Sequence, residues 1–191
     1  ATKGTIYDLL GVVVNGEEIL VTGGDYLNRS DGDSFDDSVL HFLSMADLSL
    51  IWKDGRGFDK GYVEHVRLAK RGGKSILLVT GVNISEIWDL ENRTANDMGE
   101  RWHWMWQHYS QGMEHILAHA SGMLNIFKPG QGRSFRNVPG TWFSEIVELC
   151  GSMVLLGVNQ TQLRVWDVEE LIHRERSDDL DARDRIFSLA M

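Results

Sequence analysis

Three histidines are the side chains whose spacing in this sequence could best build one site. His108, His115 and His119 follow one another at intervals of seven and four residues. On an α-helix, residues at these offsets share a face, and two imidazoles one turn apart can bind one Zn²⁺ ion. Ile116 stands where zinc proteases of the H-E-x-x-H pattern have their catalytic glutamate, which excludes that activity. A metal site here would need a carboxylate from another segment.

The same face of the expected helix carries residues suited to a protein contact. Trp104 and Gly112 fall within the sector of the histidines, about a third of a turn away from the apolar stripe of this segment. A tryptophan outside the core stripe, beside a glycine that permits close approach, favours an interface with another helix or subunit. The alternatives are metal binding and simple exposure to solvent. The predicted interface consists of Trp104, His108, Gly112, His115 and His119.

A glycine-rich loop over residues 128–136 is a basic segment in an acidic chain. Its sequence, KPGQGRSFR, combines glycines with Lys128, Arg133 and Arg136, and such a backbone can form a nest for an anion. It is not a P-loop, because G-x-x-x-x-G-K-[ST] is absent. A surface connection facing acidic partners is the alternative. Since the net charge is −9, we expect no nucleic-acid partner except locally through residues 128–136.

A third candidate lies in the segment from Asp54 to Gly81. Five of its residues stand at the spacing of the nucleoside 2-deoxyribosyltransferase family, which this short stretch resembles: Asp59, Gly61, Ala69, Gly73 and Lys74. The reactive positions do not match, since Tyr62 replaces the family's threonine and His65 stands at its nucleophilic glutamate, with Glu64 one residue earlier. The resemblance implies a nucleoside-processing enzyme in which Glu64 attacks the sugar carbon, Asp59 orients the sugar and Tyr62 packs or hydrogen-bonds.

The elements that would position these residues are an N-terminal hairpin, one β-α-β unit and a series of helices. Asn15-Gly16 between two apolar runs predicts the hairpin. The pattern predicts two parallel strands, residues 48–52 and 75–82, joined by a helix over 59–71. It predicts another strand over residues 163–167. We expect the remaining helices over 39–46, 84–91, 96–127, 141–158 and 168–191. No internal repeat is apparent. The predicted fold class is therefore α/β or α+β, with a small mixed sheet and a helix-rich C-terminal half.

Composition completes the prediction. The chain has 191 residues, 42% hydrophobic and 25% charged, as in a soluble globular protein, and we expect one domain over 1–191. Its only cysteine, Cys150, and the absence of a signal-peptide pattern predict an intracellular, cytoplasmic protein without disulfides. We expect a self-associating structural or interaction protein, a homo-oligomer without a cofactor. The alternatives are the nucleoside-processing enzyme and, because of the seven tryptophans, a carbohydrate-binding module.

Overall fold

The fold is built almost entirely from β-strands. The computed structural model describes residues 5–24, 40–54, 62–99, 101–120, 123–128, 136–139, 142–159, 162–173 and 185–188. Within these residues there is one short helix, α1 (Val168–His173), and no helix is long and apolar enough to cross a membrane. The chain divides into two compact units, residues 1–105 and 106–191. The predicted α/β or α+β class with a helix-rich C-terminal half is therefore wrong, whereas the prediction of one domain stays a prediction.

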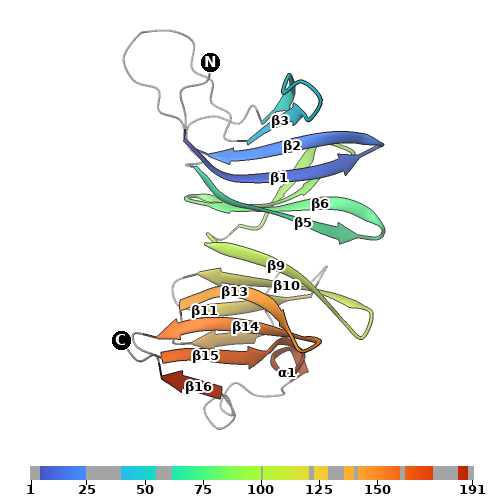
Figure 1. The fold of residues 1–191 in the computed structure, drawn as a ribbon. Coiled ribbons are helices and arrows are strands. Elements are labelled where there is room, and N and C mark those ends of the chain that lie inside the picture. Colours follow the sequence, from blue (N-terminus) through green and yellow to red (C-terminus); the bar gives the residue numbers. More distant parts are fainter. Residues whose placement is uncertain are drawn as a thin grey trace. The chain divides into compact units, whose positions relative to one another are not determined.

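Each unit contains two sheets of four antiparallel strands, and each sheet follows the chain order (Figure 1). The first sheet contains β1 (Ile6–Val14), β2 (Glu17–Gly24), β3 (Leu40–Ser44) and β4 (Leu50–Lys53). The second contains β5 (Val63–Arg71), β6 (Lys74–Gly81), β7 (Ile84–Asp89) and β8 (Thr94–Asp97). The third contains β9 (Trp104–Ser110), β10 (Met113–Ala120), β11 (Met123–Phe127) and β12 (Arg136–Pro139). The fourth contains β13 (Trp142–Leu149), β14 (Ser152–Asn159), β15 (Gln162–Asp167) and β16 (Arg185–Ser188).

A repeated two-residue turn joins the first two strands of every sheet. Its second residue is a glycine at positive φ in all four cases: Gly16, Gly73, Gly112 and Gly151. The residue before it also has positive φ, and this pair of conformations twists as antiparallel strands require. From Gly73 to Gly112 and from Gly112 to Gly151 the interval is 39 residues, against 57 from Gly16 to Gly73. The chain therefore contains a repeat of four copies, of which the first is longer. The prediction that the sequence has no internal repeat is wrong.

Strand pairing confirms that the copies correspond. A second-strand residue four positions after the turn glycine pairs with an aromatic residue of the third strand in three of the sheets: Leu77 with Trp88, Ile116 with Phe127 and Leu155 with Trp166. In the first sheet Leu20 pairs with Leu43. Four-stranded antiparallel sheets repeated at about 40 residues are the unit from which β-propellers are built, so each sheet resembles a propeller blade.

Two faces can be defined for every sheet by counting from the turn glycine. The leading face carries the residues aligned with Val12, Val14, Ile19 and Val21 of the first sheet. The trailing face carries the residues aligned with Leu9, Leu20 and Leu43. In unit 1 the leading face of the first sheet packs on the trailing face of the second, where Val66, Leu77, Val79 and Trp88 complete one buried core. Figure 1 shows β1 and β2 beside β5 and β6.

Glycine is required where the second strand ends in unit 1. A Cβ on Gly24 would collide with the carbonyl oxygen of Thr5, and one on Gly81 with that of Tyr62. In both sheets the first strand has a register shift next to this point, so that its backbone crosses close to the second strand. Gly24 and Gly81 are equivalent in the repeat, and the same packing constraint therefore acts twice.

The hairpin prediction at Asn15-Gly16 is confirmed, as are the strands expected over 48–52, 75–82 and 163–167. The helices expected over 39–46, 59–71, 84–91, 96–127 and 141–158 are wrong, because the described parts of these segments form strands β3, β5, β7, β8 to β11 and β13 to β14. No parallel β-α-β unit forms, since β5 pairs antiparallel with β6. Strands buried on both faces are continuous apolar runs, which periodicity alone does not distinguish from buried helices. Of the helix expected over 168–191, residues 168–173 are helical and 185–188 form β16.

Candidate functional site

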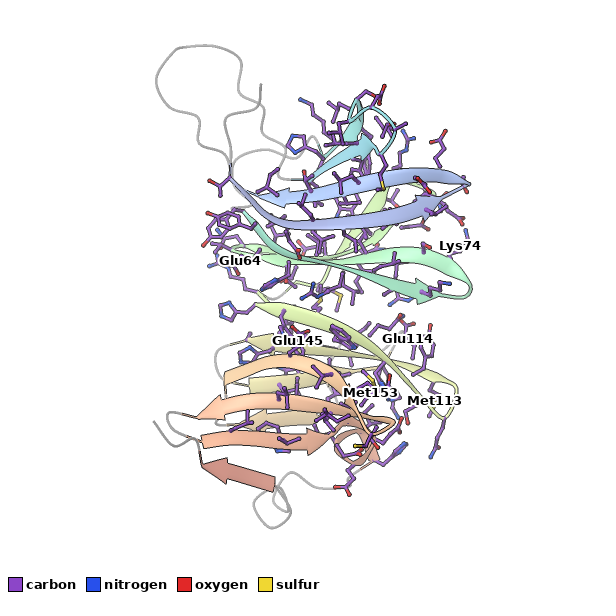
Figure 2. The ribbon with its side chains drawn as sticks, in the orientation of Figure 1. Glu64, Lys74, Met113, Glu114, Glu145 and Met153 are labelled. Carbon is purple, nitrogen blue, oxygen red and sulfur yellow. The ribbon has the colours of Figure 1, made fainter. Side chains whose placement is uncertain are left out.

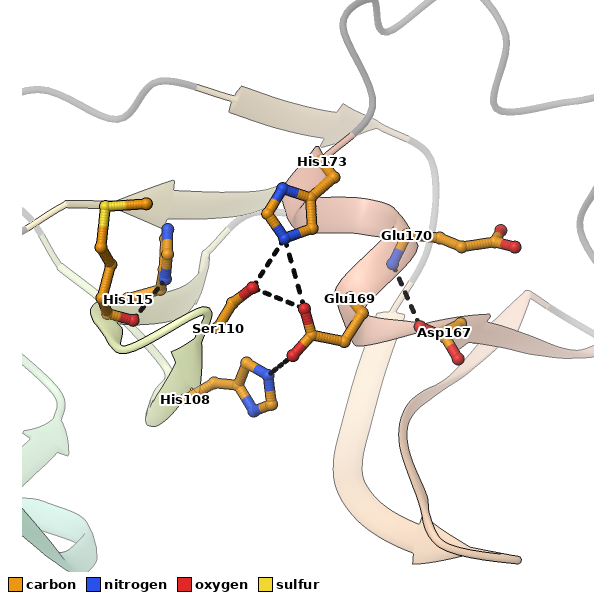
Figure 3. A network of polar contacts seen from close by, with 8 residues as sticks. His108, Ser110, His115, Asp167, Glu169, Glu170 and His173 are labelled. Atoms are coloured by element: carbon orange, nitrogen blue, oxygen red, sulfur yellow. Dashed lines mark hydrogen bonds and ion pairs between the residues drawn. The ribbon is translucent and has the colours of Figure 1, made fainter.

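A cluster of four polar side chains joins the third sheet to helix α1 (Figure 3). Ser110 ends β9 immediately before the repeated turn, and His108 lies two residues earlier on the same face of the strand. Glu169 and His173 lie one helical turn apart on α1, which follows β15 directly. Asp167 accepts a hydrogen bond from the backbone N–H of Glu170 at 3.0 Å and so caps the helix that positions them.

The distances define which groups donate. Ser110 Oγ lies 2.5 Å from Glu169 Oε2 and 2.7 Å from His173 Nε2, while His108 Nε2 lies 2.8 Å from Glu169 Oε1. A hydroxyl has one proton, and an ionised carboxylate only accepts. Ser110 therefore donates to Glu169, His173 Nε2 donates to the Ser110 oxygen, and His108 Nε2 donates to the other carboxylate oxygen.

This geometry lowers the pKa of Glu169 below its ordinary value of 4.5. The hydrogen bond from Ser110 is the largest cause, and burial opposes it. The hydrogen bond from His108 and the charges of His108 and His173 act in the same direction as Ser110. The carboxylate is thus held ionised by donors from both β9 and its own helix.

The cluster is not arranged as a catalytic triad. In a triad the histidine nitrogen nearest the serine takes its proton, while the carboxylate holds the other ring nitrogen. Here Glu169 and Ser110 both approach His173 Nε2, and the serine proton is directed to the carboxylate. Ser110 is also fully buried, whereas an attacking hydroxyl must reach a substrate. We interpret the cluster as a hydrogen-bonded cross-link between β9 and α1.

The predicted histidine face does not form, because its residues lie on two strands and a turn. Trp104 begins β9 and is half-buried, and Gly112 belongs to the β9–β10 turn. His115 and His119 lie on β10 and are buried, so they do not offer a surface to a second molecule. His108 contacts Glu169. Among the described residues, no group of three metal-ligating side chains comes together.

Burial governs the properties of His115. Its Nδ1 lies 3.0 Å from the carbonyl oxygen of Met113. Burial lowers its pKa below 6.5, the Met113 carbonyl opposes this shift, and the charges of Lys128, His108 and His173 add to it. The side chain is therefore neutral within the core rather than a titrating surface group.

The predicted nucleoside site loses the helix on which it depended. Asp59 lies outside the described residues. Tyr62 directly precedes β5, where its ring lies 5.2 Å from that of Tyr7, and Glu64 is half-buried near the start of β5 (Figure 2). A strand places successive side chains on opposite faces, so β5 does not offer the helical start that the resemblance implies. We do not propose this activity.

The predicted anion loop is described only at its ends. Lys128 is half-buried directly after β11, and the backbone of Arg136 begins β12. Arg133 lies outside the described residues, as does the side chain of Arg136. The anion-binding hypothesis therefore stays a prediction.

A surface that the sequence analysis missed is the trailing face of the first sheet. Leu9, Val13 and Leu50 are 56%, 59% and 52% exposed, and Leu20 and Leu43 are half-buried beside them. Pairing aligns Gly11, Leu20, Leu43 and Leu50 in one row across the four strands. Met45 lies over this row, because a Cβ on Gly11 would meet its sulfur at 3.7 Å. The result is one contiguous apolar face.

No family model matches the chain, and no curated protein is similar to it.

Proposed function

We propose that the chain is a self-associating interaction protein and that the trailing face of its first sheet is the contact surface. The observation that supports this most directly is a contrast between aligned residues. Val66 on the trailing face of the second sheet is 1% exposed because the first sheet covers it, whereas the aligned Leu9 is 56% exposed. Repeat proteins bury their apolar faces by stacking on neighbours, and an uncovered face of this kind marks a binding surface.

Burial of this face would stabilise an assembly substantially. Fully burying one leucine or valine side chain contributes about 1.5–3 kcal/mol, and Leu9, Val13 and Leu50 are each more than half exposed. These three side chains stand on strands β1 and β4 of one sheet, whose backbone is held by pairing with β2 and β3. The surface is therefore preorganised, which reduces the entropic cost of association.

Four of the tryptophans give no support to the carbohydrate alternative. Trp88, Trp102 and Trp166 are buried, and Trp52 stacks on Phe42 at 4.1 Å between ring centroids. Sugar stacking requires an open aromatic face. These rings contribute to the cores of the two units instead.

Sedimentation of variants of the whole chain tests the proposal. Leu9→Lys places a charge on the trailing face, on strand β1, and should convert the assembly to monomers. Val82→Lys is the matched control, since Val82 is an exposed apolar residue in the β6–β7 turn, outside this face. A wild-type chain that sediments as a monomer at high concentration would refute the proposal. So would an assembly unaffected by Leu9→Lys.

A further inference from the structure

The leading face of the fourth sheet is a second apolar surface that is only partly covered. Counting from Gly151, the residues aligned with Val12, Val14, Ile19 and Val21 are Val147, Leu149, Val154 and Leu156. Leu149 is 50% exposed, and Val147 and Leu156 are half-buried. Their counterparts on the first sheet are all buried by the second sheet. The same four positions are thus aliphatic in both sheets. On the first sheet all four are buried, whereas on the fourth only Val154 is buried.

The two middle sheets show that this aliphatic composition is not a general property of the repeat. In the second sheet one of the four positions is Arg71. In the third sheet three of the four are polar, namely His108, Ser110 and His115, and two of these bind Glu169 on α1. Where a leading face meets a polar partner, its residues are polar. The leading face of the fourth sheet is instead aliphatic, like the leading face of the first sheet, which packs on the trailing face of the second.

We infer that the leading face of the fourth sheet in one copy of the chain packs on the trailing face of the first sheet in a second copy. This inference rests on the proposed function, for which it names the partner surface. The contact between the first and second sheets provides its template, because there an aliphatic leading face covers a trailing face of Val66, Leu77 and Trp88. Leu9, Leu20 and Leu43 are the aligned residues of the uncovered trailing face.

Each surface has exposed apolar side chains within its own unit. Leu9, Val13 and Leu50 of the trailing face and Leu149 of the leading face are each at least half exposed. Figure 2 shows Glu145 on β13, at the start of the leading face, where it is aligned with Leu10 and half-buried. Asp167 shares the leading face with Glu145, because it pairs with Val154, and Glu18 and Lys53 lie on the trailing face of the first sheet. The aliphatic side chains of both faces lie beside these charged residues.

A leading face on a trailing face is a heterologous contact, which distinguishes it from self-pairing of one surface. Heterologous contacts produce closed rings or open filaments, and each copy uses a different surface at each side. One copy whose trailing face is damaged therefore keeps a functional leading face. Two differently damaged copies should still associate with each other.

A mixing experiment tests this directly. Leu9→Lys and Leu149→Lys should each give monomers in sedimentation, and an equal mixture of the two variants should give a one-to-one dimer. The double variant Leu9→Lys/Leu149→Lys, mixed with itself, should stay monomeric. Circular dichroism of each variant checks that its strands remain folded, and Leu149→Gln provides a milder second substitution at the same exposed position.

The possible failures are distinguishable. If Leu9→Lys dissociates the assembly but folded Leu149→Lys and Leu149→Gln do not, the proposed function survives and the inference is overturned in favour of two first sheets pairing with each other. If both single variants dissociate but their mixture stays monomeric, the heterologous arrangement is overturned. A wild-type monomer would remove both proposals together.

Discussion

Leu9 and Val66 occupy the same position in two copies of one repeat, seven residues before the turn glycine, yet Leu9 is 56% exposed and Val66 is 1% exposed. Their strands have the same direction, pairing and register relative to the hairpin. What differs is the neighbour, because the first sheet covers Val66 and no described element covers Leu9 to the same extent. This contrast makes the two positions a matched pair for experiment.

Lysine at these two positions should change the stability of the monomer by very different amounts. Val66→Lys buries a charge in the core of unit 1 and should lower the free energy of unfolding by more than about 3 kcal/mol. Leu9→Lys should change the stability of the monomer by no more than about 0.5 kcal/mol, because the side chain reaches solvent. Urea denaturation at a protein concentration low enough to give monomers measures both. Equal losses would show that Leu9 is covered within its own chain.

Gly81→Ala should destabilise unit 1 by about 1–3 kcal/mol, because the added Cβ collides with the Tyr62 carbonyl and the backbone must move. Gly11→Ala is the matched control in a strand interior. Its Cβ meets only the Met45 sulfur at an ordinary contact distance, and alanine also reduces the entropy of the unfolded chain. Thermal unfolding of the two variants should rank Gly81→Ala well below Gly11→Ala. The reverse order would contradict the close approach of the two strands.

Acid should weaken the cross-link between β9 and α1. Because the pKa of Glu169 is lower in the folded chain than its ordinary value of 4.5, its contribution to stability is present above pH 4.5 and is lost as the pH falls through the folded-state pKa. Glu169→Gln should therefore lower the free energy of unfolding at pH 6. Between pH 5 and pH 3, this variant should lose less stability than the wild-type chain does. Ser110→Ala should act in the same way, since it removes the largest cause of the shift. The urea midpoint, followed against pH, measures this.

Glu170→Gln is the control for this series, because it removes a carboxylate from the same helix turn. Figure 3 shows the Glu170 carboxylate directed away from the cluster. If Glu170→Gln flattens the acid dependence as much as Glu169→Gln does, the effect belongs to the net charge of α1 and not to the cluster.

His115 should make stability depend on pH in a higher range. Its folded-state pKa lies below 6.5, so the unfolded chain takes up the proton first and stability falls as the pH decreases below 6.5. His115→Leu should remove this dependence. The free energy of unfolding should then change less steeply with pH, by up to about 1.4 kcal/mol per pH unit, the slope that one proton contributes. The comparison is urea unfolding at pH 7.5 and 5.5, with the exposed His103→Leu as control. An unchanged slope in His115→Leu would show that His115 is not the group responsible.

The sequence alone determined the local features of this protein. Asn15-Gly16 required a tight turn, because both residues tolerate positive φ, and the apolar runs beside it could only form a hairpin. The same kind of turn recurs at Gly72-Gly73, Gln111-Gly112 and Cys150-Gly151. Asn-Gly and Gly-Gly are residue pairs typical of a hairpin turn, whereas Gln-Gly and Cys-Gly are not. The 39-residue spacing of the last three glycines was present in the sequence and would have indicated the repeat.

The tertiary structure decided which of these runs were strands and which side chains meet. Residues 115–119 of β10 are buried on both faces of the sheet, and this burial removes the alternation that identifies a strand. Ser110 and Glu169 are 59 residues apart, and no local pattern links them until β9 and α1 pack together. Likewise, the exposure of Leu9 and the burial of Val66 follow from what covers each sheet, a property of the neighbouring element that the residue's own sequence does not contain.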